Sequence, residues 1–423
     1  MDPTRDLATH AVTNQPPARG DRCLWAQDPV LRDHARGADA ELLARHGTAL
    51  GRVAMAEAGR AANRCKPELV AFDAGGRRLD EVRYHPAYHD FLSLGLGHGY
   101  AAGPWTGGSH VTHAAQVYLH SQVEPGSCCP MTMSYAAVPV LAACDRPDWA
   151  TKLTTCAYDP ALAPLAQKAA GTLGMAMTEK QGGSDLRAIT TRAEADAEGW
   201  RLTGHKWFCS APMSDGFLTL AREGDGISCF LVPRWLPGGA RNAIHLMRLK
   251  DKLGNAANAS AEIEYHGAWA ERLGDAGRGV ATIIAMVHHT RLDTAMAPAG
   301  LMRAALDHLH HWVSHRSAFQ RRLIDQPLMR VVLADLVLDW GGAVALGCHV
   351  ARAFDGTSEA ARGLARIGVA LAKFLNNKLA PRVIAEAMEG LGGMGYVEDT
   401  ALPMLYREAP LNGIWEGSGN VIC

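Results

Sequence analysis

The chain has 423 residues, more than one ordinary hydrophobic core accommodates, so two or three domains are expected. Hydrophobic residues make up 48% and charged residues 20%, which is typical of globular proteins, and the formal net charge of −1 gives no global basic field for nucleic acid or an anionic membrane. The ten cysteines are scattered, residues 1–20 are polar and unlike a signal peptide, and the longest apolar run, Val280–Val287, is too short to span a bilayer. We therefore expect a cytoplasmic protein with free thiols and no membrane partner.

The first part of the chain, from about residue 30 to about residue 170, has the pattern of helices. It is rich in Ala and Leu, and Leu42, Leu43, His46 and Leu50 follow helical spacing. The Gly-rich stretch Gly95–Gly108 interrupts this pattern and predicts a loop.

The middle part, from about residue 175 to about residue 270, has the pattern of strands. Ala261, Ile263 and Tyr265 alternate with polar residues, which predicts a strand with one buried face. Ile227–Val232 is a short apolar strand that Pro233 ends. Turns are expected at Gly199-Trp200, Glu223–Gly226 and Pro237–Gly239.

The last part, after about residue 280, is helical again. Ile367, Leu371, Phe374 and Leu375 lie on one face of a predicted helix. The order of helices, strands and helices predicts the α+β class. The expected boundaries are an N-terminal helical domain over residues 1–172, a middle β domain over 173–280 and a C-terminal helical domain over 281–423.

The segment Gly390–Gly395 spells G-x-G-x-x-G, the pattern of dinucleotide-binding folds. That fingerprint needs a preceding strand, whereas a helical pattern precedes it here, so a Rossmann fold is disfavoured. Two interpretations stay open. The glycines either end a helix, or they form a backbone platform for part of a cofactor.

Histidines and serines offer other candidate sites. His308, His311 and His315 share one helix face, but the chain has no H-E-x-x-H string, so a solvated or subunit-facing surface is favoured and no metal is predicted. Ser184 and Ser210 lie outside any G-x-S-x-G motif, which favours hydrogen bonding to a ligand or to backbone over nucleophilic catalysis.

Three ordered segments carry the most functional information. They are Met177–Asp185, Gly204–Ser210 and Arg407–Asn420, and in the last of these Glu416 stands between Trp415 and a Gly-Ser-Gly turn. Such a turn lets backbone N–H groups approach a ligand closely. Together the segments resemble the acyl-CoA dehydrogenase superfamily of flavoproteins. Further segments resemble its AidB-like branch, which is linked to the adaptive response to DNA alkylation: Lys250–Asn255, Asn258–Ser260 and Glu386–Gly393.

This resemblance covers essentially the whole chain, from Val12 to Cys423. It implies the acyl-CoA dehydrogenase fold, with an N-terminal helical domain, a middle β-barrel-like domain and a C-terminal four-helix domain. It also implies an FAD cofactor shared between subunits, and hence a homo-oligomer, either a dimer or a tetramer.

The resemblance assigns cofactor contacts position by position. Met175–Ser184 and Phe208–Ser210 would line the flavin ring, with the Thr178 hydroxyl at its polar edge. From sequence alone Trp207 could equally be a core aromatic or the wall of a flat ring; the resemblance places it on the flavin face away from substrate. The expected cofactor-binding residues are Met175, Met177, Thr178, Ser184, Trp207, Phe208, Ser210, Arg316, Gly392, Gly393, Ile414, Gly417 and Asn420.

Arg316 would meet the cofactor pyrophosphate from a neighbouring subunit, a role that suits a bidentate guanidinium. Gly392 and Gly393 would belong to the same cradle, and Ile414–Asn420 would close over the cofactor. One departure lies here, because Gln320 follows Phe319 where the family usually has glycine. A glutamine there could change the φ of this loop and its approach to the cofactor.

Glu416 matches the position of the family's catalytic glutamate. Removing a proton beside a thioester carbonyl needs a desolvated base, and the neighbouring Trp415 supplies an apolar environment. The leading expectation is thus acyl-CoA oxidation, even if weak, with Glu416 as the base. The alternative is a DNA-associated protective flavoprotein of the alkylation response.

The chain ends at Cys423, without the C-terminal domain to which AidB-like proteins owe DNA binding. Because the net charge is also close to zero, we expect DNA binding by this chain to be weak and labile in salt.

Overall fold

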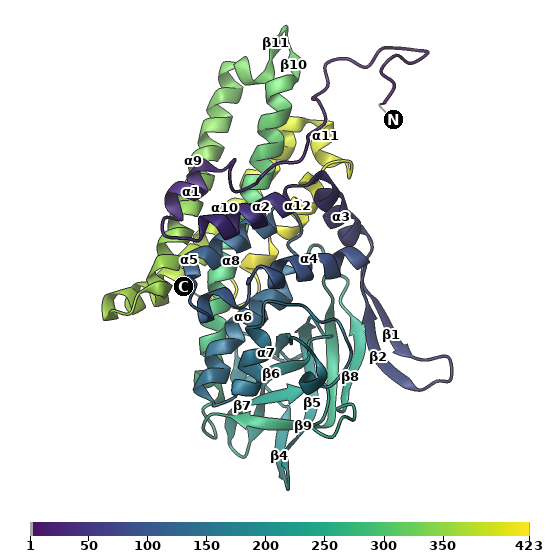
Figure 1. Cartoon of the computed structure of the whole chain (residues 1–423), viewed down its shortest axis with the longest axis vertical. Coiled ribbons are helices and arrows are strands. Elements are labelled where there is room, and N and C mark those ends of the chain that lie inside the picture. The colour runs from purple at the N-terminus through teal and green to yellow at the C-terminus, as the bar shows by residue number, and fades with distance from the viewer. Residues whose placement is uncertain (1–2, 423) are drawn as a thin grey trace.

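The computed structural model describes residues 3–422 and divides into three parts (Figure 1). The N-terminal part is mainly helical, and its helices contact both the strands and the long C-terminal helices. Its elements are α1 (Pro29–His34), α2 (Ala40–Leu50), α3 (Val53–Arg64), β1 (Glu68–Phe72), β2 (Arg78–Arg83), α4 (Pro86–Gly97), η1 (Gly103–Trp105), α5 (His110–Ser121), α6 (Cys128–Ala143), α7 (Pro147–Leu153) and η2 (Leu165–Gln167).

The middle part is a sheet that closes on itself. Its elements are β3 (Leu173–Ala176), η3 (Leu186–Ala188), β4 (Arg192–Asp196), β5 (Gly199–Ser210), β6 (Gly216–Glu223), β7 (Gly226–Pro233), β8 (Ile244–Leu249) and β9 (Ser260–Leu273). The strands follow the order β3-β6-β4-β5-β9-β7, β8 pairs with β9, and an additional β6–β7 pairing completes a ring. Ala261, Ile263 and Tyr265 are buried inside this barrel, as their alternation predicts.

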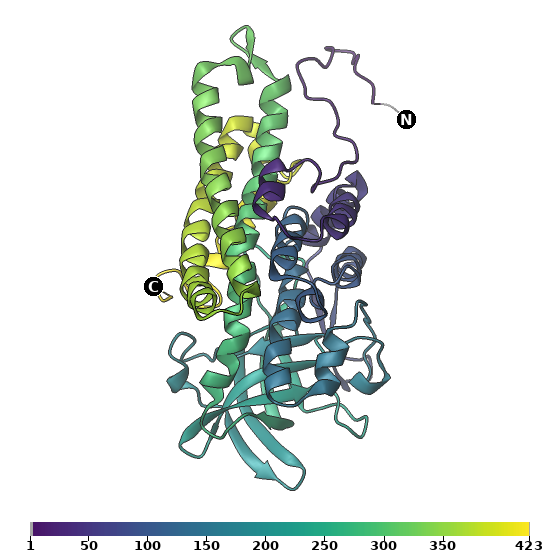
Figure 2. The ribbon, with the colours of Figure 1, turned by 60° about the vertical axis from the view of Figure 1, so that its left-hand side comes forward.

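The C-terminal part contains three long helices that run side by side (Figure 2). Its elements are α8 (Gly279–His315), β10 (Ser317–Ala318), β11 (Arg321–Arg322), η4 (Leu323–Asp325), α9 (Pro327–Asp355), α10 (Glu359–Leu391), α11 (Gly393–Tyr396), α12 (Leu402–Glu408) and η5 (Leu411–Gly413). Pro327 stands in the first turn of α9, where its missing N–H costs nothing, and the Ser358 side chain caps α10. Gly392, at φ 63°, ends α10, so the glycine motif is a helix terminator as one interpretation predicts.

The structure corrects two details of the sequence interpretation. A β-hairpin, β1–β2, lies inside the stretch read as helical, because Asp73–Gly76 forms a tight turn whose Asp73 carboxylate accepts the N–H groups of Gly75 and Arg77. Residues 95–97 complete α4 rather than starting a loop, since Gly95 packs against the Met131 side chain.

Two long helices expose apolar residues. Ile367, Leu371 and Leu375 lie on one face of α10 as predicted, but their exposed fractions are 63%, 56% and 47%, and the opposite face meets the core. Leu328 and Leu338 of α9 are exposed to 76% and 72%. Within the described residues, α9 alone is long and apolar enough to cross a membrane by length and composition, and it packs against α8 and α10.

Candidate functional site

Glu416 lies on an irregular segment that follows η5, with its backbone in the left-handed region at φ 58°. Its carboxylate oxygen Oε2 accepts a hydrogen bond of 2.9 Å from the Thr290 hydroxyl of α8. The segment folds back on itself, because the Gly419 N–H donates to the Gly413 carbonyl oxygen at 3.0 Å. A non-glycine residue at this φ is strained, so the surrounding contacts must hold the carboxylate in place.

Two cations hold the main chain that follows this carboxylate. Arg291 of α8 donates to the Glu416 carbonyl oxygen at 3.0 Å, and Lys373 of α10 donates to the Gly417 carbonyl oxygen at 2.8 Å. Burial raises the pKa of Glu416, whereas the Thr290 hydrogen bond and the charges of Lys373 and Arg291 lower it. Burial also lowers the pKa of Lys373 to about 8. The balance leaves a carboxylate of raised basicity, which suits a proton acceptor.

The barrel edge brings the two earlier motifs together. The Trp207 N–H donates to the Thr178 carbonyl oxygen at 2.7 Å, so the segment after β3 pairs with the end of β5. Met175 is buried in the sheet, and the Phe208 ring is 48% exposed. The Lys250 ammonium lies 3.2 Å from the centre of the Trp207 ring and covers it. Phe208 is therefore the more open aromatic surface, although the resemblance assigned the flavin face to Trp207.

A chain of hydrogen bonds ends at Ser210. The Lys252 ammonium lies 3.1 Å from the Ser260 hydroxyl oxygen, which lies 3.0 Å from the Ser210 hydroxyl oxygen. Lysine can only donate, so Ser260 accepts from Lys252, while either hydroxyl can be the donor between Ser260 and Ser210. The sequence motif Lys250–Ser260 thus fixes the position of the Ser210 hydroxyl two residues from Phe208.

A buried ion pair stands behind these segments. Lys206 donates to the Glu179 carboxylate at 2.7 Å, and both side chains have an exposed fraction of 0%. Burial alone would raise the pKa of Glu179, but the charge of Lys206 lowers it to about 2. The N–H group of Thr190 also donates to Glu179, so the pair fixes the loop between β3 and β4 against β5.

The predicted residues lie in separate places along one chain. Ile414 and Asn420 are exposed on the segment around Glu416, and Ser184 is exposed on the loop after β3. Arg316, Gly392 and Gly393 lie at the other end of the long helices. Arg316 follows Arg291 by 25 residues along α8, which corresponds to roughly 37 Å of helix. No single chain can place both ends against one cofactor by these residues alone.

The hairpin β10–β11 shows what the unusual Gln320 does. Phe319 and Gln320 form a two-residue turn with φ values of 51° and 65°, the conformation that hairpins of this length require. Gln320 therefore takes the left-handed backbone that a glycine would favour, at a cost in strain. The Phe319 ring is 91% exposed at the tip, and Arg316 donates to the Asn14 carbonyl oxygen at 2.7 Å.

The three histidines of the predicted surface differ from one another. His308 lines a cavity described below, His311 lies 3.0 Å from the Pro17 carbonyl oxygen, and His315 bonds back to its own helix. Among residues 3–422, no group of three or more His, Cys, Asp or Glu side chains could hold a metal ion. The cysteines within the same range are free thiols.

Sequence reasoning missed Thr290, Arg291 and Lys373. Thr290 and Arg291 interrupt the apolar pattern of α8, and Lys373 occupies a buried position of α10. A buried charge needs a partner, so a lysine on the core face of a predicted helix is a signal of a site. Its partner, however, could only be found in three dimensions.

Comparisons with known proteins agree with this architecture. The model of the adaptive response protein AidB N-terminal domain matches residues 14–160, the acyl-CoA dehydrogenase middle domain matches residues 174–268, and the acyl-CoA dehydrogenase C-terminal domain matches residues 277–423. The chain belongs to the acyl-CoA dehydrogenase family, whose members are FAD-dependent flavoproteins.

Individual relatives narrow the similarity to the AidB-like branch. The chain is 46% identical to the AidB protein of Escherichia coli K12, over 98% of this chain and 79% of that protein. It is 34% identical to acyl-CoA dehydrogenase family member 11 of Caenorhabditis elegans, over 86% of this chain and 62% of the relative. The crystal structure of C. elegans ACDH-11 in complex with C11-CoA superposes with a TM-score of 0.88, 30% identity, and coverage of 98% of this chain and 74% of that one. Butyryl-CoA dehydrogenase from Megasphaera elsdenii, at 18% identity and a TM-score of 0.73, shares the fold.

Proposed function

We propose that this protein oxidises an acyl-CoA with FAD as the electron acceptor and Glu416 as the base. The observation that carries the proposal is the Glu416 carboxylate, which is raised in basicity and bonded to Thr290 between two cations. Such a group can take a proton from the carbon next to a thioester carbonyl. Bound flavin supplies the acceptor for the hydride that leaves the neighbouring carbon. The C. elegans relative with bound C11-CoA supports an acyl-CoA as the substrate class.

The residues at the barrel edge fit a flavin ring. Phe208 offers an open aromatic surface, and Ser210 offers a hydroxyl that its hydrogen bond with Ser260 holds in place. The buried ion pair Glu179–Lys206 holds the strands that carry them. Lys252 adds a positive charge behind Ser210, which favours electron density on an adjacent ring.

The predicted pyrophosphate cradle, formed by Arg316, Gly392 and Gly393, lies far from Glu416 and supports an oligomer in which two chains share each cofactor site. Arg316 and the exposed glycines Gly392 and Gly393 suit a pyrophosphate, because a guanidinium binds anions and glycine without a side chain lets a ligand approach the main chain closely. Since they lie far from Glu416 in one chain, we propose that a second copy supplies them, in a dimer or tetramer. The exposed apolar faces of α9 and α10 support association of copies.

Anaerobic titration with a panel of acyl-CoAs tests the activity. We expect the protein to purify yellow, and its flavin absorbance to bleach with at least one acyl-CoA. Glu416→Gln keeps the shape and removes the base, so bleaching should slow by about 10²-fold or more while FAD stays bound. Glu41→Gln, at an exposed ion pair on α2, is the control. A colourless protein that takes up no added FAD, or equal bleaching rates in the two variants, would refute the proposal.

The match to the adaptive response protein AidB N-terminal domain also keeps a second function open, protection of DNA against alkylation. For this chain alone we expect only weak, salt-labile binding to duplex DNA, because its charges nearly cancel. A gel shift at physiological salt measures this. A tight complex that resists salt would promote the DNA-associated role over acyl-CoA oxidation. We also propose a cytoplasmic location, which the free thiols support.

A further inference from the structure

A cavity lies away from Glu416, under the N-terminal segment of residues 15–24, which we call the strap. Its volume is about 470 Å³, and its walls come from the strap, α3, the second half of α8 and the segment around α12. His308 follows Thr290 by 18 residues on α8, which is roughly 27 Å along the helix. The cavity is therefore far from Glu416, but it lies next to the predicted pyrophosphate cradle, because Trp312 lines the cavity and the Arg316 guanidinium lies 5.5 Å from the centre of the Trp312 ring.

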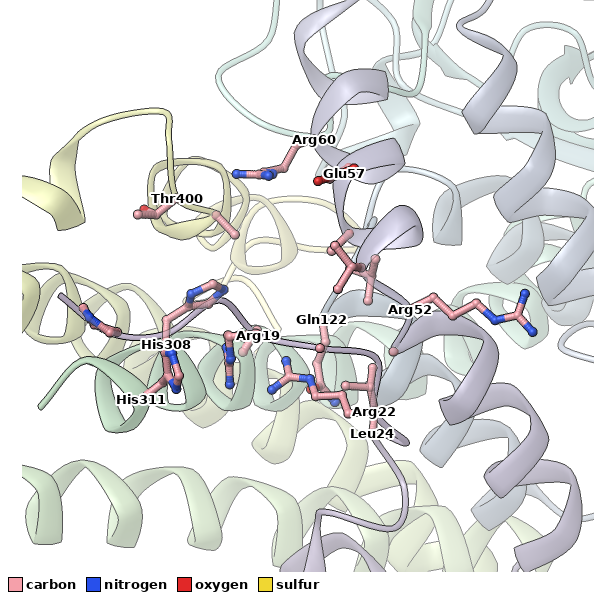
Figure 3. Close-up of a pocket in the computed structure, with 18 of the residues that line it drawn as sticks. Arg19, Arg22, Leu24, Arg52, Glu57, Arg60, Gln122, His308, His311 and Thr400 are labelled. Atoms are coloured by element: carbon pink, nitrogen blue, oxygen red, sulfur yellow. The ribbon is translucent and has the colours of Figure 1, made fainter. Parts of the chain in front are cut away.

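Arginines surround this cavity. Figure 3 shows Arg19, Arg22 and His308 on one side of the space and Arg60 with Thr400 across it, while Arg52 points away. The carboxylates that line the cavity are Glu57 and Asp399.

The arginines on the strap side share too few carboxylates. Asp307 accepts from Arg19 at 2.5 Å and from Arg22, and it also lies 3.6 Å from Arg303. Arg303 donates in addition to Asp28 at 3.1 Å. Of these groups only Arg19 and Arg22 line the cavity, and they share the single Asp307 carboxylate; because each guanidinium has five N–H donors, donors remain for a further anion.

Arg60 approaches from the opposite side. It donates to the main-chain carbonyl oxygen of Asp399 at 2.7 Å, a contact that positions its guanidinium without neutralising it. His308 responds to the resulting positive field, because burial and then the charge of Arg19 lower its pKa to about 4, with Arg22 and Arg60 contributing in the same direction. Asp307 opposes this effect but does not cancel it. His308 is thus a neutral hydrogen-bonding group beside the arginines.

The remaining wall is apolar. Leu24, Leu50, Val53, Leu391 and Met404 line the cavity beside the arginines. A bare ion would leave this surface in contact with water, whereas a ligand with an organic part would cover it. The combination of clustered guanidinium groups with an apolar wall selects an organic anion, and a phosphate ester offers more acceptor oxygens to several arginines than one carboxylate does.

We propose that this cavity binds an organic phosphate, with the phosphate between Arg19, Arg22 and Arg60 and the organic part against Leu50, Val53 and Met404. The strap residues hold the site closed, since Pro17 accepts from His311 and Arg19 is bound to Asp307. The inference does not depend on acyl-CoA oxidation, because none of these residues contacts Glu416, Phe208 or Ser210.

Calorimetric titration of the full chain with ADP, in the presence of saturating FAD, tests the proposal. ADP should bind, inorganic phosphate should bind more weakly, and adenosine should bind at least 10-fold more weakly than ADP. Arg60→Gln should weaken ADP binding about 10-fold or more, because one of the facing charges is lost. This variant leaves the ion pairs of Asp307 intact, so it should fold. Arg187→Gln, at an exposed position of the middle domain, is the matched control and should bind as the parent does.

A further variant separates this cavity from the predicted cofactor cradle. Arg316→Gln should leave ADP binding unchanged if the cavity is the binding site. Loss of ADP binding in Arg316→Gln with full binding in Arg60→Gln would assign the signal to the cradle and overturn the proposal. Absence of binding by ADP and phosphate, or adenosine binding as tight as that of ADP, would overturn it as well.

Discussion

The barrel edge and the C-terminal segment both contribute to the proposed acyl-CoA reaction, but different interactions hold them in place. At the barrel edge, Lys206 and Glu179 are both fully buried and bonded, and Lys206 donates as well to the Leu220 carbonyl oxygen at 2.8 Å. Around Glu416, by contrast, the backbone is irregular and strained, and side chains of α8 and α10 hold it from outside. A surface that binds a flat ring benefits from rigidity. A base changes its charge when it takes up and releases a proton, so it needs neighbouring groups that stabilise both of its protonation states.

Breaking the barrel's ion pair should give the largest effect. Lys206→Met leaves the Glu179 carboxylate buried without its cation, which should cost about 3–5 kcal/mol of unfolding free energy. Urea denaturation of the purified variant measures the loss. Arg45→Gln removes a charge from the exposed pair Arg45–Glu41 on α2 and should change stability far less. Similar midpoints for the two variants would show that the buried pair does not hold the wall.

The same contrast separates what the sequence could predict from what it could not. The segments Met177–Asp185 and Gly204–Ser210 were recognisable because each is a continuous string, and the structure pairs them through Trp207 and Thr178. Strand alternation likewise predicted the buried face of β9 correctly, since period-two patterns follow directly from strand geometry. Helical spacing predicted α10 correctly. It did not predict that the apolar face of this helix is exposed in the single chain.

The contacts of Glu416 could not be predicted, because its partners are remote in sequence. Thr290 lies 126 residues away, Arg291 125 residues away, and Lys373 is 44 residues from Gly417. Hydrophobic patterning places each residue on a helix face, but it does not say which faces meet. The ion pair Lys206–Glu179 joins residues 27 positions apart, which the pairing of the segment after β3 with the end of β5 brings together.

Glu408 joins the two regions and should make stability depend on pH. Its carboxylate, at the end of α12, accepts from the main chain and side chain of Asn255 in the segment before β9. Burial raises the pKa of Glu408 to about 7, while the Asn255 hydrogen bonds and Lys252 lower it and Glu124 raises it. The folded pKa lies above the unfolded value near 4.5, so the stabilising contribution is complete below about pH 4.5 and is lost as the pH rises through 7.

Across this window the free energy of unfolding should fall by about 3 kcal/mol relative to that of Glu408→Gln. This figure follows from about 1.4 kcal/mol for each pH unit between the two pKa values. Urea denaturation of both proteins between pH 4.5 and pH 8 gives the difference, in which other titrating groups cancel. Parallel stability curves for the two proteins would mean that Glu408 does not titrate in this range.

The smallest effect should come from the C-terminal segment, where Lys373 adjusts the base without forming part of a folded wall. Its ammonium is buried and donates to the Gly417 carbonyl oxygen, next to Glu416. Because that charge lowers the pKa of Glu416, Lys373→Met should raise this pKa further and move the acidic limb of the pH–rate profile for anaerobic flavin bleaching, where the rate rises with pH, to higher pH. Arg382→Gln changes an exposed cation on the same helix and is the matched control. Equal profiles in the two variants would mean that Lys373 only anchors the main chain. A shifted profile with an unchanged bleaching rate at high pH would show that the charge of Lys373 sets the pKa of Glu416. The C-terminal segment would then act through charge, whereas the barrel acts through fixed geometry.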